Sequence, residues 1–237
     1  MIDLFEVSLP SGESEEDLQL LRYALTHNLK VSLRPIQGFG HYLDRGEVSS
    51  AQAGELQRKM VQAGADLERQ LDALADYAKI CLRPSRLEEL DLSWVLQSVV
   101  KQQLARFHIG QKCVSLAETI PPVVADRGIL ELVFSELISN ALLFTPAHQL
   151  PCVKVTSRRQ GDRVETSIQD CGLGIPSGCL ELLGKPFQRF HSEAHLVPGV
   201  GLGLTRALRG LAALQGRLHC SSETGQGSLL LVSLRAA

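Results

Sequence analysis

The sequence predicts an α+β protein in which an N-terminal antiparallel helical hairpin precedes an α/β sandwich domain. Two observations lead to this fold class. Through the first third of the chain, leucines and other apolar residues recur at spacings of three and four, as on the buried face of a helix. After residue 84, strand-length and helix-length apolar runs interleave without the strict βαβ regularity of a parallel sheet. We therefore expect a hairpin domain over residues 1–83 and a second domain over residues 84–237.

The hairpin is predicted from two apolar stripes and the break between them. Ser14 with Asp17 resembles a capping box at the start of the first stripe, which runs over residues 18–43. Polar and glycine residues at 46–50 interrupt the pattern, and a second stripe follows over residues 56–77. One hairpin cannot bury two stripes alone, so a homodimeric four-helix bundle is the economical arrangement. Packing of the hairpin on the rest of its own chain is the alternative.

The second domain is predicted from three helical patterns and five short strand patterns. The helices are expected at residues 92–104, 126–143 and 205–214. The strands are expected at residues 113–116, 153–156, 164–168, 218–221 and 228–234. Glycine-containing turns at 161–162 and 225–227 mark two hairpins, which close one sheet against the helices.

Composition limits the partners and the compartment. The chain has 237 residues, of which 44% are hydrophobic, and 24 basic residues against 26 acidic ones. This near-neutral balance supplies no field for non-specific capture of nucleic acid, so no nucleic-acid partner is expected. No apolar run approaches the roughly 18–20 residues that cross a bilayer, and residues 1–6 do not resemble a signal peptide. Six cysteines without a C-x-x-C pair favour reduced thiols, and we expect a cytoplasmic protein without a membrane segment.

Four short segments carry the candidate chemistry. They are Glu136-Leu-Ile-Ser-Asn140-Ala-Leu-Leu-Phe-Thr145-Pro146, Asp170-Cys-Gly172-Leu-Gly174-Ile-Pro176, Phe187-Gln-Arg189-Phe190 and Gly199-Val-Gly201-Leu-Gly203-Leu204. Glu136 and Asn140 share one face of an apolar helix, where unpaired polar groups are costly. The last segment opens a helix, and glycine-rich turns at a helix start bind phosphate. Each segment alone also has an ordinary explanation, such as an amphipathic helix edge or a β-turn.

In this order and spacing, the segments resemble the N, G1, F and G2 boxes of the histidine kinase ATP-binding domain. That domain has the GHKL (Bergerat) fold, which gyrase B, Hsp90 and MutL share. The closing Gly225-x-Gly227-Ser228 is similar to a late motif of the same group. The resemblance covers roughly residues 84–237 and implies ATP and Mg²⁺ as cofactors.

The resemblance implies a role for the polar side chains of the first two segments. Asn140 would hold Mg²⁺ through its amide oxygen, and Glu136 would handle a water or a proton one turn away. Asp170 would accept a hydrogen bond from the adenine amino group. Relatives often carry a lysine three residues after the metal-binding asparagine. Leu143 stands there, which predicts weaker nucleotide affinity.

The remaining cofactor-binding positions follow from the same resemblance. Gly172 and Gly174 would let the chain pass close to the nucleotide, and Arg189 would reach the terminal phosphate. The other positions implied are Gly199, Gly201, Gly203, Leu204 and Ser228. Cys171, beside Asp170, is expected to be a small buried residue, the alternative being a modifiable thiol that blocks the nucleotide.

The first helix contains a diverged form of the family's phosphoacceptor box, Thr26-His-Asn-Leu-Lys-Val-Ser-Leu-Arg-Pro35. His27 would be the nucleophile that attacks the γ-phosphate. Asn28 replaces the acid that relatives carry, and it orients the ring but is a poor proton acceptor. Val31 stands where relatives with phosphatase activity hold a water. We therefore expect a slow protein-histidine autokinase with little or no phosphatase activity.

The leading hypothesis is a histidine kinase core that binds Mg-ATP, autophosphorylates on His27 and transfers the phosphoryl group to an aspartate of a response-regulator receiver domain. The signal would come from a separate sensor protein or from further parts of a longer kinase. The alternative is an ATP-binding pseudokinase or phosphotransfer scaffold that does not autophosphorylate. An ATPase clamp of the gyrase or Hsp90 type and a protein-serine kinase of the anti-sigma type are less favoured, because the hairpin before the ATP domain suits neither.

Overall fold

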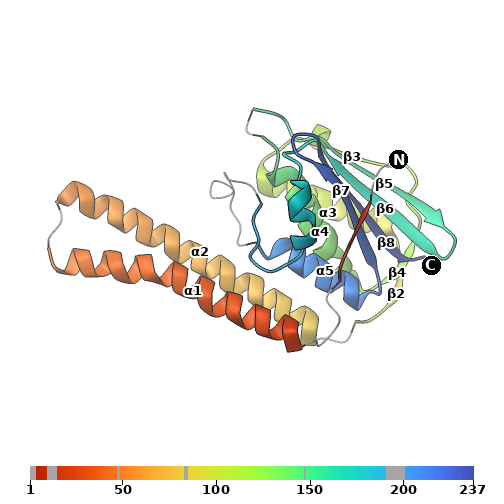
Figure 1. The fold of residues 1–237 in the computed structure, drawn as a ribbon. Coiled ribbons are helices and arrows are strands. Elements are labelled where there is room, and N and C mark those ends of the chain that lie inside the picture. Colours follow the sequence, from red (N-terminus) through yellow and green to blue (C-terminus); the bar gives the residue numbers. More distant parts are fainter. Residues whose placement is uncertain (1–3, 10–14, 47–48, 83–84, 147, 191–200) are drawn as a thin grey trace. The chain divides into compact units, whose positions relative to one another are not determined.

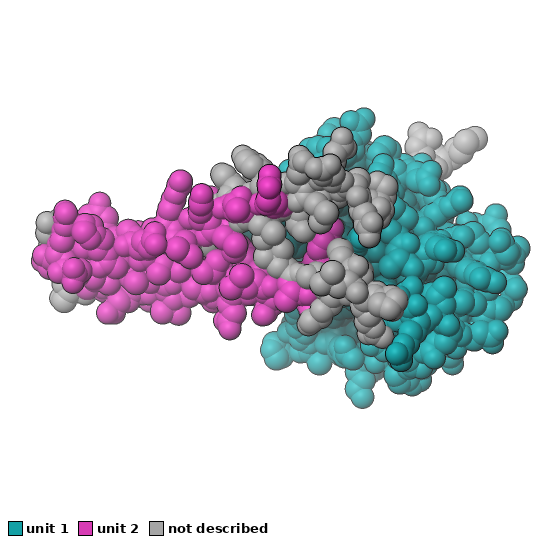
Figure 2. Space-filling view, turned by 90° about the horizontal axis from the view of Figure 1, so that it is seen from below, with its two compact units in different colours: residues 1–12, 79–237 teal, residues 13–78 magenta. Residues whose placement is uncertain are grey.

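The computed structural model describes residues 4–9, 15–46, 49–82, 85–146, 148–190 and 201–237 (Figure 1). The chain divides into two compact units, shown in different colours in Figure 2. The hairpin unit comprises residues 13–78, and the sheet unit comprises residues 1–12 together with 79–237. The α+β fold class is confirmed. The predicted domain boundary at residues 83–84 lies outside the described residues and stays a prediction.

The hairpin unit consists of two long antiparallel helices, α1 (Glu15–Asp44) and α2 (Ser50–Leu82), which lie side by side along their length (Figure 1). Pro35 lies inside α1. Few of the described side chains in this unit are buried, and five large apolar ones are exposed. These are Val31, Leu33, Tyr42, Val61 and Leu71. The hairpin therefore presents apolar surface that it cannot cover by itself.

The sheet unit is built on a six-stranded sheet in the order β1-β7-β8-β6-β5-β3. Its strands are β1 (Phe5–Val7), β3 (Val114–Leu116), β5 (Val153–Gln160), β6 (Arg163–Asp170), β7 (Arg217–Glu223) and β8 (Gly227–Arg235). Neighbouring strands are antiparallel except for β3 and β5, which run parallel. A separate two-stranded sheet pairs β2 (Glu88–Leu90) with β4 (Val123–Ala125).

Three helices cover one face of the six-stranded sheet: α3 (Leu92–Phe107), α4 (Arg127–Leu143) and α5 (Gly203–Ala213) (Figure 1). Two short 3₁₀ helices, η1 (Gln111–Cys113) and η2 (Ser177–Leu182), complete the unit. The core between helices and sheet includes the fully buried Phe134, Ile168 and Leu211. The same burial pattern alternates along β6, so every second side chain of that strand faces the helices. None of the described helices is long and apolar enough to cross a membrane.

Strand β1 is an element that the sequence pattern does not reveal. It adds an edge to the sheet by pairing antiparallel with β7, with Phe5 opposite Cys220 and Val7 opposite Leu218. Only Val7 is buried, at 2% exposure. A three-residue strand with one buried side chain is too short for a period of two to be detected. Residues 5–7 thus join the sheet unit, although the sequence places them with the hairpin.

Candidate nucleotide site

Asp170 ends strand β6 with its side chain on the helix-covered face, two residues beyond the buried Ile168. Its Oδ1 accepts hydrogen bonds from the backbone N–H of Gly172 at 2.8 Å and of Ser228 at 3.1 Å. No hydrogen bond from the described residues reaches Oδ2, so this oxygen can accept from an N–H of a ligand. Burial raises the pKa of the Asp170 carboxyl above its ordinary value of 3.8, although the two N–H donors act in the opposite direction.

The turn after Asp170 packs tightly against two other parts of the backbone. The N–H of Leu173 donates to the carbonyl of Phe144, at the end of α4, at 2.9 Å. A Cβ on Gly172 would lie 2.6 Å from that same carbonyl oxygen, and one on Gly174 would lie 1.9 Å from the carbonyl oxygen of Glu223. Contacts inside the protein therefore already require both glycines. The sequence predicts glycine at these two positions because the chain passes close to a nucleotide, and that is an additional reason for glycine there.

Ser228 contributes to the site through its backbone and anchors the turn through its hydroxyl. Ser222 Oγ donates to the carbonyl of Gly227 at 2.9 Å and lies 2.9 Å from Ser228 Oγ. The only hydroxyl hydrogen of Ser222 is already used in the bond to Gly227, so the Ser228 hydroxyl is the donor in the second bond. Ser222 Oγ also accepts the N–H of Ile175 at 2.8 Å. The β7–β8 hairpin thus fixes the turn that carries Gly172 and Gly174.

Glu136 and Asn140 lie one turn apart on α4, directly beneath the start of α5. A Cβ on Gly203 would lie 2.5 Å from Glu136 Oε2 and 3.7 Å from Asn140 Oδ1. Glu136 also forms an ion pair with Arg206 of α5, and both side chains are only 17% exposed. Glycine at 203 allows the first residue of α5 to approach both polar side chains. The structure therefore brings Asn140, Glu136 and Gly203 together.

The first turn of α5 offers groups that suit an anion. Leu202 at the N-cap forms no side-chain cap hydrogen bond, so the first backbone N–H groups of the helix are not capped by it. The hydroxyl of Thr205 is buried and has no hydrogen-bond partner among the described residues. Uncapped N–H groups at a helix start bind phosphate, and a buried unpaired hydroxyl calls for a partner. Thr205 is a candidate phosphate-binding residue that motif spacing does not identify. It is recognised in the structure because its hydroxyl is buried without a hydrogen-bond partner among the described residues.

Phe187 and Gly201 are in contact just before α5. The N–H of Phe187 donates to the carbonyl of Gly201 at 2.8 Å. A Cβ on Gly201 would lie 2.8 Å from the carbonyl carbon of Phe187, and Gly201 has φ +74°. Arg189 is exposed, and Leu204 is half-buried against the core. Gly199 lies outside the described residues.

Two comparisons with known proteins agree on the type of this site. The model of the family of histidine kinase-, DNA gyrase B- and HSP90-like ATPases matches residues 125–237. The chain is also 29% identical over 220 residues to the histidine protein kinase DivJ of Caulobacter vibrioides, an alignment that covers 89% of this chain and 36% of the relative. The chain is similar to histidine kinases, and its residues 125–237 match the ATPase family that includes them.

Solved structures of histidine kinases have a similar fold. The full-length kinase ShkA in complex with AMPPNP matches with a TM-score of 0.58 and 22% identity, covering 93% of this chain and 46% of that one. The kinase ThkA in complex with the response regulator TrrA matches with a TM-score of 0.65 and 16% identity, covering 92% of this chain and 61% of that one. The chain spans about a third of the length of the curated relatives it matches.

The two residues predicted for phosphoryl chemistry belong to the hairpin unit. His27 and Asn28 lie in α1, and their side chains are outside what the structure describes. Leu143, three residues after Asn140, is half-buried on α4, so no cation stands at that position. Cys171 is exposed, which corrects the expectation of a buried residue. It follows the last strand residue, where β6 leaves the sheet.

The donors in the sheet unit suit Mg²⁺ held together with a nucleotide. Among the described residues there is no cluster of three or more His, Cys, Asp or Glu side chains that could hold a metal alone. An amide oxygen such as Oδ1 of Asn140 is a hard ligand of the kind that Mg²⁺ accepts, and Mg²⁺ takes its other ligands from phosphates and water. The proximity of Asn140 Oδ1 to the start of α5 fits this sharing of ligands.

Arg206→Gln is expected to destabilise the sheet unit by about 2 kcal/mol, or about 5 °C in Tm, because it removes a largely buried ion pair. Urea unfolding followed by the fluorescence of Trp94, the only tryptophan in the chain, measures this. Arg209→Gln, one turn further along α5, is the matched control, since Arg209 forms no ion pair within the described ranges. Equal destabilisation by both variants would show that the ion pair adds nothing.

Proposed function

We propose that this chain is a histidine kinase core that binds Mg-ATP in the sheet unit, autophosphorylates on His27 and transfers the phosphoryl group to an aspartate of a response-regulator receiver domain. The observation that carries the proposal is the Asp170 carboxylate, whose Oδ1 is held by two backbone N–H groups while Oδ2 is left for a ligand. ATP binding is further supported by the AMPPNP complex of ShkA, and the receiver partner by the complex of ThkA with TrrA. Because the reaction consumes ATP, the proposal also places this core in the cytoplasm.

Each group of the sheet unit has one task in nucleotide binding. Asp170 Oδ2 accepts a hydrogen bond from the adenine amino group, so the base is identified by an N–H that other bases lack at that place. The N–H groups at the start of α5 bind phosphate oxygens, assisted by the Thr205 hydroxyl. Asn140 Oδ1 holds Mg²⁺, which neutralises the phosphate charge. Leu143 supplies no cation, so affinity is lower than in relatives with lysine there.

In the phosphoryl step, an imidazole nitrogen of His27 attacks the γ-phosphorus, and the bond to the bridging oxygen of ADP breaks. The imidazole must also lose a proton. Asn28 follows His27 where a carboxylate would accept that proton, and its amide is a poor base at neutral pH. Glu136 is held by Arg206 beside Asn140, where its carboxylate can position a water near the metal. Slow autophosphorylation follows from the missing base on α1.

A second copy of the chain is part of the proposal. Exposed apolar side chains of the hairpin unit, among them Leu33, Tyr42 and Leu71, are the kind that a four-helix bundle covers. Val31, four residues after His27, cannot hold a water for hydrolysis of a phosphorylated receiver, which supports low phosphatase activity. The alternative, an ATP-binding scaffold without autokinase activity, is favoured by one observation, the asparagine at position 28.

Incubation of the purified protein with γ-labelled Mg-ATP tests the autokinase. The wild type is expected to acquire an acid-labile, base-stable label, because phosphohistidine has this stability, and His27→Ala is expected to acquire none. His41→Ala is the matched control, since His41 lies further along α1 and outside the phosphoacceptor box. Absence of label from the wild type, with nucleotide binding intact, would leave the scaffold as the function. Label that survives acid would indicate a serine or threonine acceptor.

A further inference from the structure

Two exposed cysteines adjoin the last residue pair of β5 and β6, beside the nucleotide site. The ladder ends with Val153 paired with Asp170, and Cys152 and Cys171 are the next residues just beyond that pair. Val153 and Asp170 point toward the helices, and side chains alternate along a strand, so both thiols lie on the opposite face. Both cysteines are exposed and free. They are therefore neighbours on one face and within reach of solvent reagents.

Opposed residues in an antiparallel pair have the spacing that a disulfide needs. Their Cα atoms are about 4.5 or 5.5 Å apart, depending on the position in the ladder, and a disulfide spans about 4.4–6.8 Å. A second observation places the thiols close together. Burial raises the pKa of the Cys171 thiol, the backbone N–H of Cys152 opposes this, and the charge of Cys152 contributes to it. Such contributions require that the two residues lie near one another.

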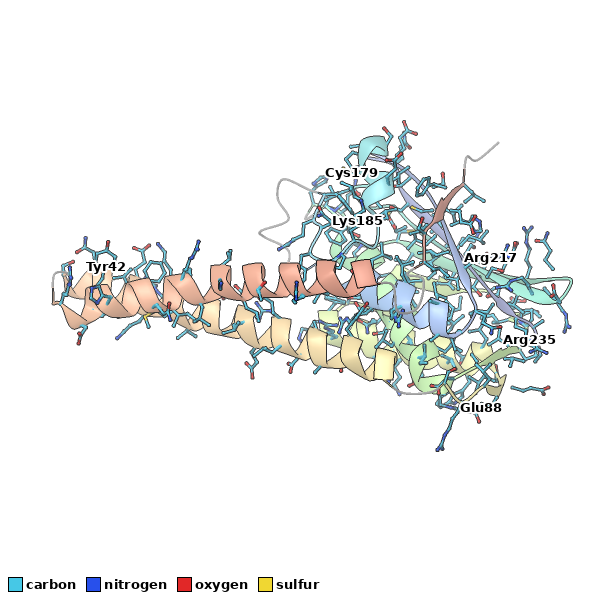
Figure 3. The ribbon with its side chains drawn as sticks, turned by 60° about the horizontal axis from the view of Figure 1, so that its bottom comes forward. Tyr42, Glu88, Cys179, Lys185, Arg217 and Arg235 are labelled. Atoms are coloured by element: carbon cyan, nitrogen blue, oxygen red, sulfur yellow. The ribbon has the colours of Figure 1, made fainter. Side chains whose placement is uncertain are left out.

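The other described cysteines do not share these properties. Cys113 and Cys220 are buried, and burial raises the pKa of the Cys220 thiol to about 12, so little reactive thiolate forms there. Cys179 of η2 (Figure 3) is half-buried and is not part of the β5–β6 pair. Among the described cysteines, a small oxidant that enters from solvent therefore meets one pre-arranged pair.

We propose that Cys152 and Cys171 form a reversible disulfide by exchange with a low-molecular-weight disulfide, and that this bond weakens nucleotide binding at the adjacent Asp170. In the first step, one cysteine thiolate attacks the small disulfide, expels one small thiol and leaves a mixed disulfide. In the second step, the other cysteine thiolate attacks the protein sulfur and expels the second small thiol. The protein loses two thiol protons and two electrons, and the small disulfide gains them.

The effect on nucleotide binding, which rests on the proposed function, follows from the position of Cys171. Asp170 Oδ1 accepts the N–H of Gly172 across this residue. Gly172 cannot move toward Phe144, because an added Cβ would already lie 2.6 Å from the Phe144 carbonyl oxygen. A bond that pulls Cys171 toward Cys152 therefore displaces the Asp170 carboxylate or its N–H donor. Loss of one such hydrogen bond predicts about tenfold weaker nucleotide affinity.

Treatment of the whole chain with hydroxyethyl disulfide tests the proposal. Intact mass is expected to fall by about 2 Da, since two thiols become one disulfide. Peptide mapping should then link Cys152 to Cys171. Anisotropy of a fluorescent ADP analogue should show about tenfold weaker binding, restored by dithiothreitol. Cys171→Ser should instead retain one small-thiol adduct on Cys152, and Cys179→Ser should behave as the wild type.

The outcomes separate the disulfide from its effect and from the proposed function. A wild-type protein that carries only mixed adducts, or a link between other cysteines, overturns the proposal. A Cys152–Cys171 link with unchanged nucleotide affinity overturns the regulatory half. If the reduced protein binds no ADP analogue, the proposed function fails with the regulatory half, while mass and peptide mapping still decide whether the disulfide forms.

Discussion

Asp170→Asn is expected to weaken nucleotide binding by about 100-fold, because it places an amide N–H₂ or a neutral oxygen where a carboxylate accepts the adenine amino group. The fold should survive the change. The asparagine oxygen can still accept hydrogen bonds from the N–H groups of Gly172 and Ser228, which in the wild type donate to Asp170 Oδ1. Titration with a fluorescent ADP analogue measures the affinity. Asp162→Asn, in the exposed turn between β5 and β6, is the matched control and should bind as the wild type.

The same variant has a predictable effect on stability. The pKa of Asp170 is raised in the folded state by burial, so its contribution to stability is fully present below the ordinary value of 3.8 and is lost as the pH rises through the folded pKa. Asparagine does not ionise and suffers no such loss. Asp170→Asn should therefore be at least as stable as the wild type at pH 7, and its advantage should shrink as the pH falls toward 3.8. A variant less stable than the wild type at pH 7, or one that binds the analogue normally, would contradict this account.

The helices of the sheet unit were predictable because their signals are local. The sequence predicts a helix over residues 126–143, and α4 spans Arg127–Leu143. The difference of one residue comes from Asp126, which is the N-cap: its carboxylate accepts the N–H of Ile129 at 3.2 Å. Asp126 also accepts the N–H of Arg86 at 2.9 Å, which joins the cap to the chain before β2. The sequence around Asp126 indicates that it caps a helix. It gives no indication that the same side chain also holds Arg86, 40 residues earlier in the chain.

Strand β5 was predicted only as far as its burial extends. The sequence predicts a strand over residues 153–156, but β5 continues to Gln160. Its outer half, from Ser157 onward, is polar and not buried. Pairing with β6 extends to Gln160 opposite Arg163, supported by the ion pair between Arg158 and Glu165 at 2.8 Å. Hydrophobic periodicity ends where burial ends, whereas backbone pairing does not need burial.

Motif spacing identified the segments of the site but not the contacts between them. The ion pair of Glu136 with Arg206 joins two helices that are far apart in sequence, and no pattern within either helix indicates it. The same holds for the Phe144 carbonyl, which accepts from Leu173. The sequence predicts Cys171 to be a small buried residue rather than a modifiable thiol. It is exposed because it is the first residue beyond that strand and lies on the uncovered face.

Gly174→Ala is expected to lower the free energy of unfolding of the sheet unit by about 3–4 kcal/mol, through overpacking and backbone strain together. The added Cβ would lie 1.9 Å from the carbonyl oxygen of Glu223 and 2.7 Å from its carbonyl carbon, and Gly174 has φ +66°. Because the obstacle is backbone rather than the end of a flexible side chain, the turn and β7 must separate. That separation strains the hydrogen bond from Gly225 N–H to the Leu173 carbonyl, at 2.8 Å. Urea unfolding followed by Trp94 fluorescence measures the change.

Gly225→Ala isolates the cause, because Gly225 has φ +79° but nothing within 4 Å of an added Cβ. This control carries the cost of a positive φ alone, about 1 kcal/mol. The difference between the two variants is therefore the cost of pushing the turn away from Glu223. It should be accompanied by weaker nucleotide binding in Gly174→Ala only, since Asp170 is attached to the displaced turn. Equal stability of the two variants would mean that the Gly174 position tolerates a side chain and that glycine there serves the nucleotide rather than the packing of the hairpin.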